Sequence, residues 1–470
     1  MTGTSEAVAH HIASGAFEQA EALALTAIRE APDDLGLRLH AATCLAKELS
    51  FDRALEQCLH VLHRPEAAWM QRLDAVRTMV ACATQSGIPD IVRPYLDGLD
   101  DGTAKHPSER CWRPRILARL GAAEEALGEL RALLQEFPGD PMITGILGQT
   151  MMELGDGEGR RFDLAQSSRA FFDLYYPGSP PRERMWEGEA LEGRSVAILC
   201  HSGFGDLFQF IRHVRGLKAL GAGHVAAVAN ARCHGLVASA GVDEVVAPEE
   251  QNALLARSDL WVPVFGLLRV AASVGDGVET GGYLAAPDSE AATRLAQTMR
   301  DRAAGRPCLG LYWHSDRDLG EHKSAPLAAM MPLLARSDVH WLILQRGFGL
   351  RRFLDAGLGT ATTVMGEDLS FDDTAALMNR LDGVVSICAW PFHLAGALGL
   401  RTWLLAGRVM DSRHLNRERM SVLYSDCANL VRQPRIGDWP GAVARMNCEL
   451  DAFVAGFAPS GAEGPNEARC

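Results

Sequence analysis

Two patterns of hydrophobic and polar positions divide the chain. Residues 1–155 carry apolar side chains at helical spacing, whereas from residue 194 onward short continuous apolar runs alternate with helical stretches. A short apolar run bounded by turn signals is typical of a buried strand. Strands that alternate with helices predict parallel sheets covered on both faces. We therefore expect an α-helical region followed by an α/β region.

The α/β region contains two sets of predicted strands, separated by a break near Gly305, Arg306 and Pro307. The first set is 195–199, 225–229, 244–246 and 260–264; after a helical stretch at 288–304, the second is 308–314, 340–344, 362–365, 384–387 and 402–405. Two sets predict two Rossmann-like domains, residues 194–304 and 305–457, with a cleft between them. In such sheets ligands bind beyond the carboxyl ends of the strands. A last helix, 439–453, follows a cap at Gly437 and Asp438.

The helical region, residues 1–155, repeats with a period of 34 residues. Phe17 and Ala20 recur as Phe51 and Ala54, and a proline follows near the end of each repeat. This period, with small residues where helices cross, is typical of tetratricopeptide repeats. A generic helical bundle is the alternative, because the copy around residues 70–110 is degenerate. Stacked helix pairs form a concave surface that commonly binds peptides or other proteins.

Two further segments complete the predicted organisation. Residues 156–193 form a linker, in which a last helix at 162–174 is broken by the proline-rich stretch 175–181. Residues 458–470 form a disordered tail.

Composition and net charge argue against several classes of protein. The 470 residues are 47% hydrophobic and 22% charged, with no apolar run near the ~18 residues that a membrane span needs. The net charge of −13 argues against a nucleic-acid surface. The first residues lack a signal-peptide pattern, and the 11 cysteines lack metal-type spacing. We therefore expect a cytoplasmic protein with reduced thiols.

The segment 200–206 combines a sharp turn with an acidic side chain. It joins the strand at 195–199 to a predicted helix at 207–220, so the segment reads as strand, glycine elbow and helix. Gly203 and Gly205 let the backbone approach a ligand closely, and Asp206 falls where the helix begins. A helix start that faces a cleft suits an anion or a reacting hydroxyl. Asp206 is therefore either a helix cap or a catalytic residue.

Two other loops at strand ends carry candidate chemistry. One contains Glu321, His322 and Lys323; the other begins a helix with Pro391 and His393. The free backbone donors of that helix start, together with His393, could hold a phosphate, and Lys323 could bring a positive charge to the same place. The structural alternatives are a hydrogen-bonded histidine at a helix start and a solvated surface lysine.

Five motifs occur in an order that resembles a known family. They are WEGE with LEG at 186–193, GFGDLFQFIRHV at 203–214, FDDTAALMNRLDGVVS at 371–386, HLAGALG at 393–399 and RQPRIGDW at 432–439. In this order they resemble the tetratricopeptide-bearing glycosyltransferases related to the ADP-heptose:lipopolysaccharide heptosyltransferases of glycosyltransferase family 9. The resemblance covers residues 186–439, and the preceding repeats fit the same architecture.

The resemblance implies a GT-B fold, in which two Rossmann-like domains hold a nucleotide-sugar mainly on the second. It places Asp206 at the position of the family's proposed general base and His393 on the histidine of the donor-site motif. By the same resemblance, Lys323 lies near the position of a basic residue that contacts the diphosphate. This chain departs from the family at Cys388 and Ala389, where relatives usually have Asp-Thr, so a carboxylate suited to a ribose hydroxyl is missing.

These observations together predict an N-terminal tetratricopeptide-like solenoid followed by a GT-B glycosyltransferase that needs neither a metal nor a cofactor. Asp206 would be catalytic, and Gly203, Gly205, Lys323, Pro391 and His393 would bind the donor. The expected partners are a nucleotide-sugar and a protein acceptor, such as flagellin, or a surface glycan. The alternative is a catalytically decayed transferase that acts as a protein-interaction module through its repeats. The change at Cys388 and Ala389 favours that alternative.

Overall fold

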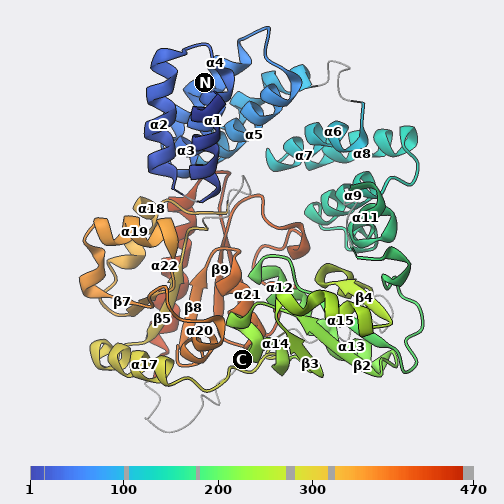
Figure 1. Cartoon of the computed structure of the whole chain (residues 1–470). Helices are drawn as coiled ribbons and strands as arrows, with labels where there is room; N and C mark the ends of the chain where they lie inside the picture. Colours follow the sequence, from blue (N-terminus) through green and yellow to red (C-terminus); the bar gives the residue numbers. More distant parts are fainter. Residues whose placement is uncertain are drawn as a thin grey trace.

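The computed structural model describes residues 2–14, 16–99, 105–175, 180–270, 281–315 and 323–458. A helical region leads into two parallel sheets that lie next to each other below it (Figure 1). No helix among these described ranges is both long and apolar enough to cross a lipid bilayer.

The helical region consists of helices that pack mainly against their neighbours in sequence. They are α1 (Thr2–Ala13), α2 (Phe17–Glu30), α3 (Leu35–Lys47), α4 (Phe51–Leu62), α5 (Trp69–Gln85), α6 (Pro107–Arg110), α7 (Trp112–Arg119), α8 (Ala123–Glu136), α9 (Pro141–Glu153), α10 (Gly159–Asp163) and α11 (Arg169–Tyr175). Helices α2 and α4 begin at Phe17 and Phe51, the two repeated phenylalanines that are 34 residues apart. The predicted helix at 162–174 is instead divided between α10, a 3₁₀ turn and α11.

Buried alanines and capping aspartates explain how closely the helices pack and where the second helix of a pair begins. Ala20 in α2 and Ala54 in α4 are fully buried, so the neighbouring helices approach closely. Asp34 and Asp140 cap α3 and α9, and their carboxylates accept backbone hydrogen bonds at 3.0 Å from Leu37 and at 2.9–3.0 Å from the first turn of α9. The pairs α2–α3 and α8–α9 therefore each combine a helix, a turn that contains proline and a second helix capped by aspartate.

The first sheet has four parallel strands in the order β3-β2-β1-β4. The strands are β1 (Ser195–Leu199), β2 (His224–Val228), β3 (Glu244–Val246) and β4 (Leu260–Pro263). Its short helices are α12 (Phe204–Phe210), α13 (Val214–Ala219), α14 (His234–Ser239) and α15 (Gln251–Arg257). The predicted single helix at 207–220 is divided into α12, a 3₁₀ turn and α13.

The second sheet has six parallel strands in the order β10-β9-β8-β5-β6-β7. The strands are β5 (Cys308–Tyr312), β6 (His340–Ile343), β7 (Thr363–Val364), β8 (Gly383–Ser386), β9 (Thr402–Ala406) and β10 (Ala428–Arg432). The helices are α17 (Glu290–Ala303), α18 (Leu327–Leu334), α19 (Gly347–Asp355), α20 (Phe371–Met378), α21 (Trp390–Ala397) and α22 (Trp439–Ala455). Asp438 caps α22 as predicted, with its carboxylate 2.8 Å from the amide nitrogen of Gly441.

Helix α17 comes before the predicted break at residues 305–307 but packs on the second sheet, against α20, β5 and β6. The chain therefore crosses from one sheet to the other ahead of α17. Buried apolar side chains from one face of the first sheet and from the second sheet form one continuous core, which includes Phe208 of α12 and Phe392 of α21, whereas the other face of the first sheet packs in a separate cluster. The two sheets are thus packed together through these two helices.

The end of α5 joins the helical region to the second sheet. The Gln85 side chain donates to the Ser324 carbonyl oxygen and accepts from the Trp439 indole nitrogen, both at 2.9 Å. Gly437 has a φ of +78°, and a Cβ atom there would lie 2.5 Å from the Gly87 amide nitrogen. Only glycine allows this conformation and this approach together. The helical region therefore sits close to Lys323.

Candidate functional site

The glycine elbow brings Asp206 to the start of α12, directly beyond the carboxyl end of β1. Gly203 is the N-cap residue, and Asp206 lies in the first turn of the helix. A Cβ atom on Gly203 would lie 3.4 Å from Asp206 Oδ2, so the carboxylate lies over the turn. Asp206 is therefore not the N-cap residue. Its carboxylate places a negative charge beyond the carboxyl end of β1.

Helix α21 faces the elbow from the second sheet. It begins after β8, with Ala389 as its N-cap and Pro391 in its first turn. A Cβ atom on Gly205 would lie 3.1 Å from His393 Cδ2 and 3.5 Å from the Trp390 amide nitrogen. The backbone of the elbow therefore covers the start of α21. A side chain at position 205 would therefore press on the His393 ring.

His393 is a buried hydrogen-bonding group. Its Nδ1 lies 3.1 Å from the Tyr424 hydroxyl oxygen, and its Nε2 lies 3.8 Å from Cys388 Sγ. Burial lowers the pKa of His393 to about 3, so the imidazole is neutral at pH 7. A neutral His393 therefore brings no positive charge to the site. As a neutral ring it can only donate or accept a hydrogen bond.

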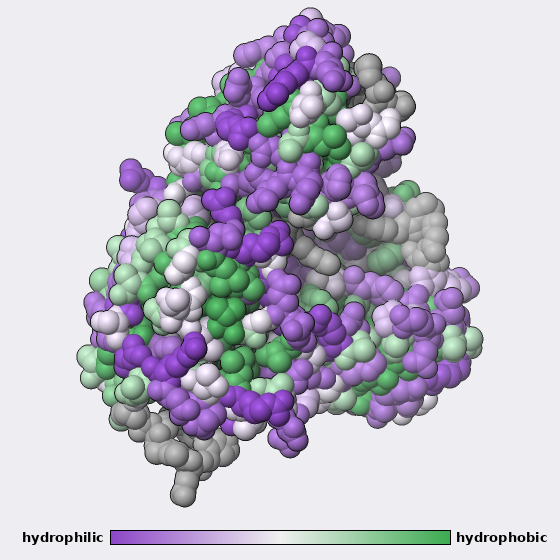
Figure 2. Space-filling model, turned by 60° about the vertical axis from the view of Figure 1, so that its left-hand side comes forward, coloured by the Kyte–Doolittle hydropathy of each residue, from purple (hydrophilic) through white to green (hydrophobic). Residues whose placement is uncertain are grey.

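A central cavity of about 900 Å³ brings most of the predicted residues together. Gly203, Gly205, Asp206, Lys323 and His393 all line it. Pro391 is buried in the first turn of α21 and is not among the lining residues. Glu321 and His322 lie outside the described residues. The surface is hollowed between the helical part at the top and the sheets below it (Figure 2).

The central cavity is strongly electropositive, although the whole chain carries a net charge of −13. Its lining carboxylates are Asp206 and Asp411. Its lining cations are Arg77, Arg115, Arg119, Arg232, Lys323, Arg346 and Arg413. A cavity with low-dielectric walls and an excess of one charge attracts ligands of the opposite charge. The site is therefore suited to an anion.

Arg346 and Arg232 form the clearest anion-binding feature. Arg346 precedes α19, and its guanidinium lies 5.4 Å from the ring centre of Phe371 and 5.6 Å from that of Trp390. Both arginines donate to the Leu369 carbonyl oxygen, at 2.9 Å from Arg346 and 2.7 Å from Arg232. Burial, followed by the nearby charge of Arg232, lowers the pKa of Arg346.

One donor of Arg346 has no partner. The Arg346 Nε is buried and makes no hydrogen bond within the described residues. A buried cationic donor without a partner is costly, and an anion that accepts from it would remove that cost. Arg346 thus points to a phosphate or carboxylate ligand in the central cavity.

Arg413 and Asp411 form an ion pair at the back of the central cavity. The Arg413 Nη1 lies 3.3 Å from Asp411 Oδ2, and its Nε lies 3.9 Å from Asp163 Oδ2 of the helical region. Burial alone would lower the pKa of Arg413, but the charges of Asp411, Asp163 and Asp206 outweigh burial and raise it. Arg413 therefore stays charged and provides a positive charge near Asp206.

The helical region supplies one wall of the central cavity. Two guanidinium groups lie over the ring of Trp112 in α7, at 4.4 Å from its centre for Arg77 and 4.7 Å for Arg115. These residues and Arg119 line the same cavity as Asp206. A ligand in the cavity is therefore surrounded by all three parts of the chain.

Sequence reasoning missed the arginines of the site for an identifiable reason. Arg232 follows β2 and Arg346 follows β6, so both lie at the carboxyl ends of parallel strands, where ligands bind. The sequence positions of Arg232 and Arg346, shortly after predicted strands, could therefore have identified both as candidate ligand-binding residues. Arg77, Arg115 and Arg413 had no such signal, because their place depends on how separate parts of the chain pack together.

The described residues contain no group of three or more His, Cys, Asp or Glu side chains arranged to hold a metal ion. The expected independence from metal remains a prediction. The structure instead provides positive charge through its arginines and Lys323.

No family model matches the chain, and no curated protein matches it. Several solved structures resemble it in part. A family 9 glycosyl transferase from Veillonella parvula is 10% identical with a TM-score of 0.43, covering 58% of this chain and 100% of its own. The ADP-heptose lipopolysaccharide heptosyltransferase II of E. coli is 14% identical with a TM-score of 0.37, covering 56% and 98%. An O-GlcNAc transferase from Thermobaculum terrenum is 15% identical with a TM-score of 0.28, covering 90% and 94%. Because every one of these TM-scores is below 0.5, we infer function from the site itself.

Proposed function

We propose that this protein is a GT-B glycosyltransferase that moves a sugar from a nucleotide-sugar donor to an acceptor hydroxyl. The observation that carries the proposal is the central cavity. It lies beyond the strand ends of two parallel sheets and places the Asp206 carboxylate among seven cations. A carboxylate can remove a proton from an acceptor, and the cations can bind and stabilise a diphosphate leaving group.

The donor diphosphate belongs mainly on the second sheet, at the place that Arg232 of the first sheet reaches. Arg346 offers an unpartnered buried donor, Arg232 adjoins it, and Lys323 adds a further charge in the same cavity. Hydrogen bonds between such cations and phosphate are roughly twice as strong as neutral ones. The start of α21 contributes less than these cations, because Pro391 has no N–H and Gly205 covers Trp390.

Asp206 acts as the general base. The acceptor oxygen attacks the anomeric carbon, the bond from that carbon to the diphosphate oxygen breaks, and the acceptor proton passes to Asp206. The electron pair of the broken bond stays on the diphosphate, where Lys323, Arg346 and Arg232 balance the new charge. His393 stays neutral and supports the site through Tyr424.

The helical region presents the acceptor. Its 34-residue spacing and capped helix pairs support tetratricopeptide-like repeats, which fits an acceptor that is a protein or a surface glycan. The ten cysteines of the described ranges are all free thiols. Free thiols support a reducing, cytoplasmic location.

The alternative is a decayed transferase that binds partners through its helical region. Cys388 and Ala389 favour it, since neither offers the carboxylate that relatives place before the donor-site histidine. A thermal-shift screen with ADP, UDP, GDP and CDP separates the two proposals. A ligand that binds only the folded state raises the melting temperature. We expect at least one nucleotide to do so, whereas a protein that binds none of the four supports the decayed transferase.

A further inference from the structure

A buried chain of hydrogen bonds leads from the helix of Asp206 to His393. At one end the Tyr283 hydroxyl donates to the Phe208 carbonyl oxygen of α12 at 2.6 Å. The Tyr283 hydroxyl also shares a hydrogen bond with the hydroxyl of Tyr424, which lies 3.1 Å from His393 Nδ1. The two tyrosines and the histidine are all buried. The chain therefore connects α12 with α21 through polar groups that water does not reach.

Arg212, in the 3₁₀ turn that follows α12, holds the two tyrosines in place. Its guanidinium lies 4.8 Å from the ring centre of Tyr283 and 4.7 Å from that of Tyr424. It donates to the Tyr283 hydroxyl oxygen at 3.3 Å and to the Leu423 carbonyl oxygen at 2.7 Å, and it also hydrogen-bonds the Tyr424 hydroxyl. A guanidinium has donors and no acceptor. Both hydroxyl oxygens therefore accept from Arg212, and each hydroxyl keeps its one proton for another partner.

Counting these protons gives the direction of the chain. A carbonyl oxygen can only accept, so the single hydroxyl proton of Tyr283 belongs to its bond with Phe208. The bond between the two hydroxyls then uses the proton of Tyr424, which leaves none for His393. Burial lowers the pKa of His393 to about 3, so the ring has one proton at pH 7. That proton must lie on Nδ1 and be donated to Tyr424, which makes Nε2 an acceptor.

Cys388 lies on the acceptor side of His393. Its Sγ is 3.8 Å from His393 Nε2 and 3.9 Å from His414 Nε2. A thiol has one proton, so it can donate to one ring while its sulfur accepts from the other. His414 Nδ1 lies 3.4 Å from Ser421 Oγ, which accepts from the Leu423 amide and keeps its own proton for His414. His414 therefore presents Nε2–H to the sulfur, and the Cys388 thiol donates to His393.

A thiol fits this arrangement better than a carboxylate does. Position 388 is where the resemblance predicts a carboxylate, and an ionised carboxylate can only accept. His393 would then need a proton on Nε2 as well as on Nδ1, and it would become a buried imidazolium. Burying such a charge is costly. Cys388 therefore matches a neutral His393 ring.

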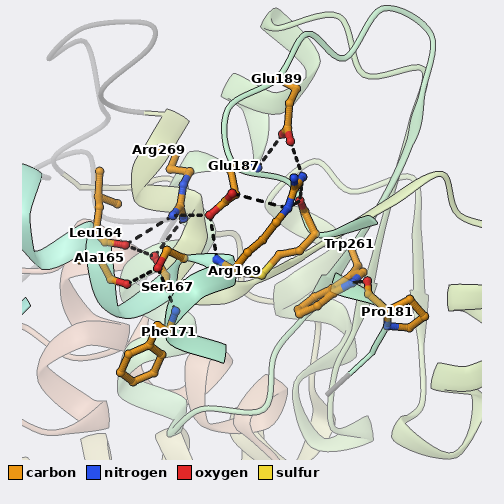
Figure 3. A network of polar contacts seen from close by, with 12 residues as sticks. Leu164, Ala165, Ser167, Arg169, Phe171, Pro181, Glu187, Glu189, Trp261 and Arg269 are labelled. Carbon is orange, nitrogen blue, oxygen red and sulfur yellow. Dashed lines mark hydrogen bonds and ion pairs between the residues drawn. The ribbon is translucent and has the colours of Figure 1, made fainter. Parts of the chain in front are cut away.

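A second polar network shows a different principle (Figure 3). Between the helical region and the first sheet, Arg169 Nε lies 3.5 Å from Glu187 Oε2, and Arg269 Nη2 lies 3.9 Å from Glu187 Oε1. Charge decides which group donates in that network. In the chain to His393, the tyrosine hydroxyls and the imidazole are neutral, so the positions of the protons decide it. Removing one hydroxyl should therefore move a proton without changing the charge.

We propose that Tyr424 is a positioning residue that fixes His393 in the Nδ1–H tautomer, and that Cys388 supplies the matching donor to Nε2. A ring with a bare Nε2 accepts hydrogen bonds but donates none to a phosphate, so the donor phosphates depend on the cations of the central cavity. The importance of the tautomer for catalysis rests on the proposed glycosyl transfer. The tautomer itself is a property of the folded chain.

Nitrogen-15 NMR of the full chain, labelled at histidine, tests the tautomer. Long-range proton–nitrogen correlations distinguish a protonated ring nitrogen from a bare one, and His393→Gln and His414→Gln variants assign the signals. At pH 7 we expect Nδ1–H for His393 and Nε2–H for His414. Tyr424→Phe removes the acceptor of the Nδ1 proton, so His393 should change to the Nε2–H form. Tyr95→Phe removes a hydroxyl that lies 3.3 Å from His63 Nε2 in the helical region, and it should leave His393 unchanged.

Variants of Cys388 test the other side of the ring. Cys388→Ser keeps a donor, so His393 should stay neutral with its proton on Nδ1. Cys388→Asp replaces the donor by an acceptor, so the titration midpoint of His393 should rise from about 3 towards neutral pH. The variants leave in place the other charged or titratable groups that act on His393, which are Asp411, His414, Arg212 and Lys323.

Three results would overturn the proposal. They are a wild-type His393 with its proton on Nε2, an unchanged tautomer in Tyr424→Phe, or a Cys388→Asp variant in which His393 still titrates near pH 3. If Cys388→Asp does not fold, the first two measurements decide the proposal. Nucleoside-diphosphate binding is measured on the same samples. An Nδ1–H tautomer in a protein that binds no nucleotide would keep the hydrogen-bond chain and reject the transferase.

Discussion

Gly205 of α12 lies directly against His393 of α21, so the two elements that build the site meet at a residue without a side chain. A Cβ atom on Gly205 would lie 3.1 Å from His393 Cδ2, which is tighter than most packed side chains tolerate. The start of α12, with Asp206, is thereby held against the start of α21. The Asp206 carboxylate and the start of α21 are thus positioned relative to each other by the absence of a side chain at position 205.

A Gly205→Ala substitution should disturb this contact. We expect the free energy of unfolding to fall by ~1–3 kcal/mol, because an added methyl group in a packed contact must displace its neighbours. Gly128→Ala is the control, since position 128 lies on α8 with open space around it. Alanine there should stabilise the helix by ~0.5–1 kcal/mol. Denaturant unfolding measures both, and a Gly205→Ala variant as stable as wild type would show that the contact can relax freely.

Arg346 should dominate nucleotide affinity. An Arg346→Met substitution removes a charge-assisted contact to phosphate, so the Kd for the nucleoside diphosphate should rise about ten-fold or more. Arg351→Met removes the same charge from an exposed position of α19 and should change the Kd little. Calorimetric titration of wild type and both variants with a nucleoside diphosphate measures the Kd values to be compared.

Lys323→Met and Cys388→Ala extend that comparison. Lys323→Met should also weaken nucleotide binding, whereas Cys388→Ala should not, because a thiol is a poor partner for phosphate. If Cys388→Ala were the only substitution to weaken binding, the donor contacts would lie elsewhere.

His393 should stay neutral in mildly acidic solution. Its pKa of about 3 in the folded protein is below the ~6.5 of an unfolded chain. The unfolded state therefore binds the proton first, and the stability that neutral His393 contributes above pH 6.5 is lost as the pH falls from 6.5 towards 3. Imidazole NMR signals, assigned with a His393→Gln variant, measure the titration. A midpoint near 6.5 would contradict the burial that we describe.

Much of the fold could be predicted from the sequence. Nine of the ten strands in the described part of the chain were predicted, because fully buried parallel strands appear as short apolar runs. The strand at Ala428–Arg432 was missed, because Asn429 is exposed and Arg432 interrupts the apolar pattern. The helix at 207–220 was predicted as continuous, since helical spacing continues through the 3₁₀ turn at residues 211–213.

The site was predicted only in part. Asp206, Lys323 and His393 follow strands and do meet in one cavity, because parallel strands end at the same edge of their sheet. The charge of His393 could not be predicted, since it depends on burial by Tyr424 and its neighbours. The wall formed by Arg77, Trp112 and Arg115 depends on how the helical region docks on the sheets.

EDTA should not inhibit transfer. Seven lining cations already place positive charge around the expected diphosphate, and they would repel a divalent cation. We expect equal rates with and without the chelator. Activity that disappears with EDTA and returns with Mg²⁺ or Mn²⁺ would instead indicate a metal-dependent enzyme.

The most direct test of the proposed function is the turnover of nucleotide sugars by wild type and by Asp206→Asn. Asparagine preserves the shape of the side chain but cannot take the acceptor proton. Release of nucleoside diphosphate, coupled to product formation, measures the rate. We expect the substitution to lower kcat by ~10²–10⁴-fold, the usual contribution of a general base, with nucleotide affinity nearly unchanged. A variant that turns over within a few fold of wild type would remove Asp206 from the mechanism and contradict the proposed proton transfer.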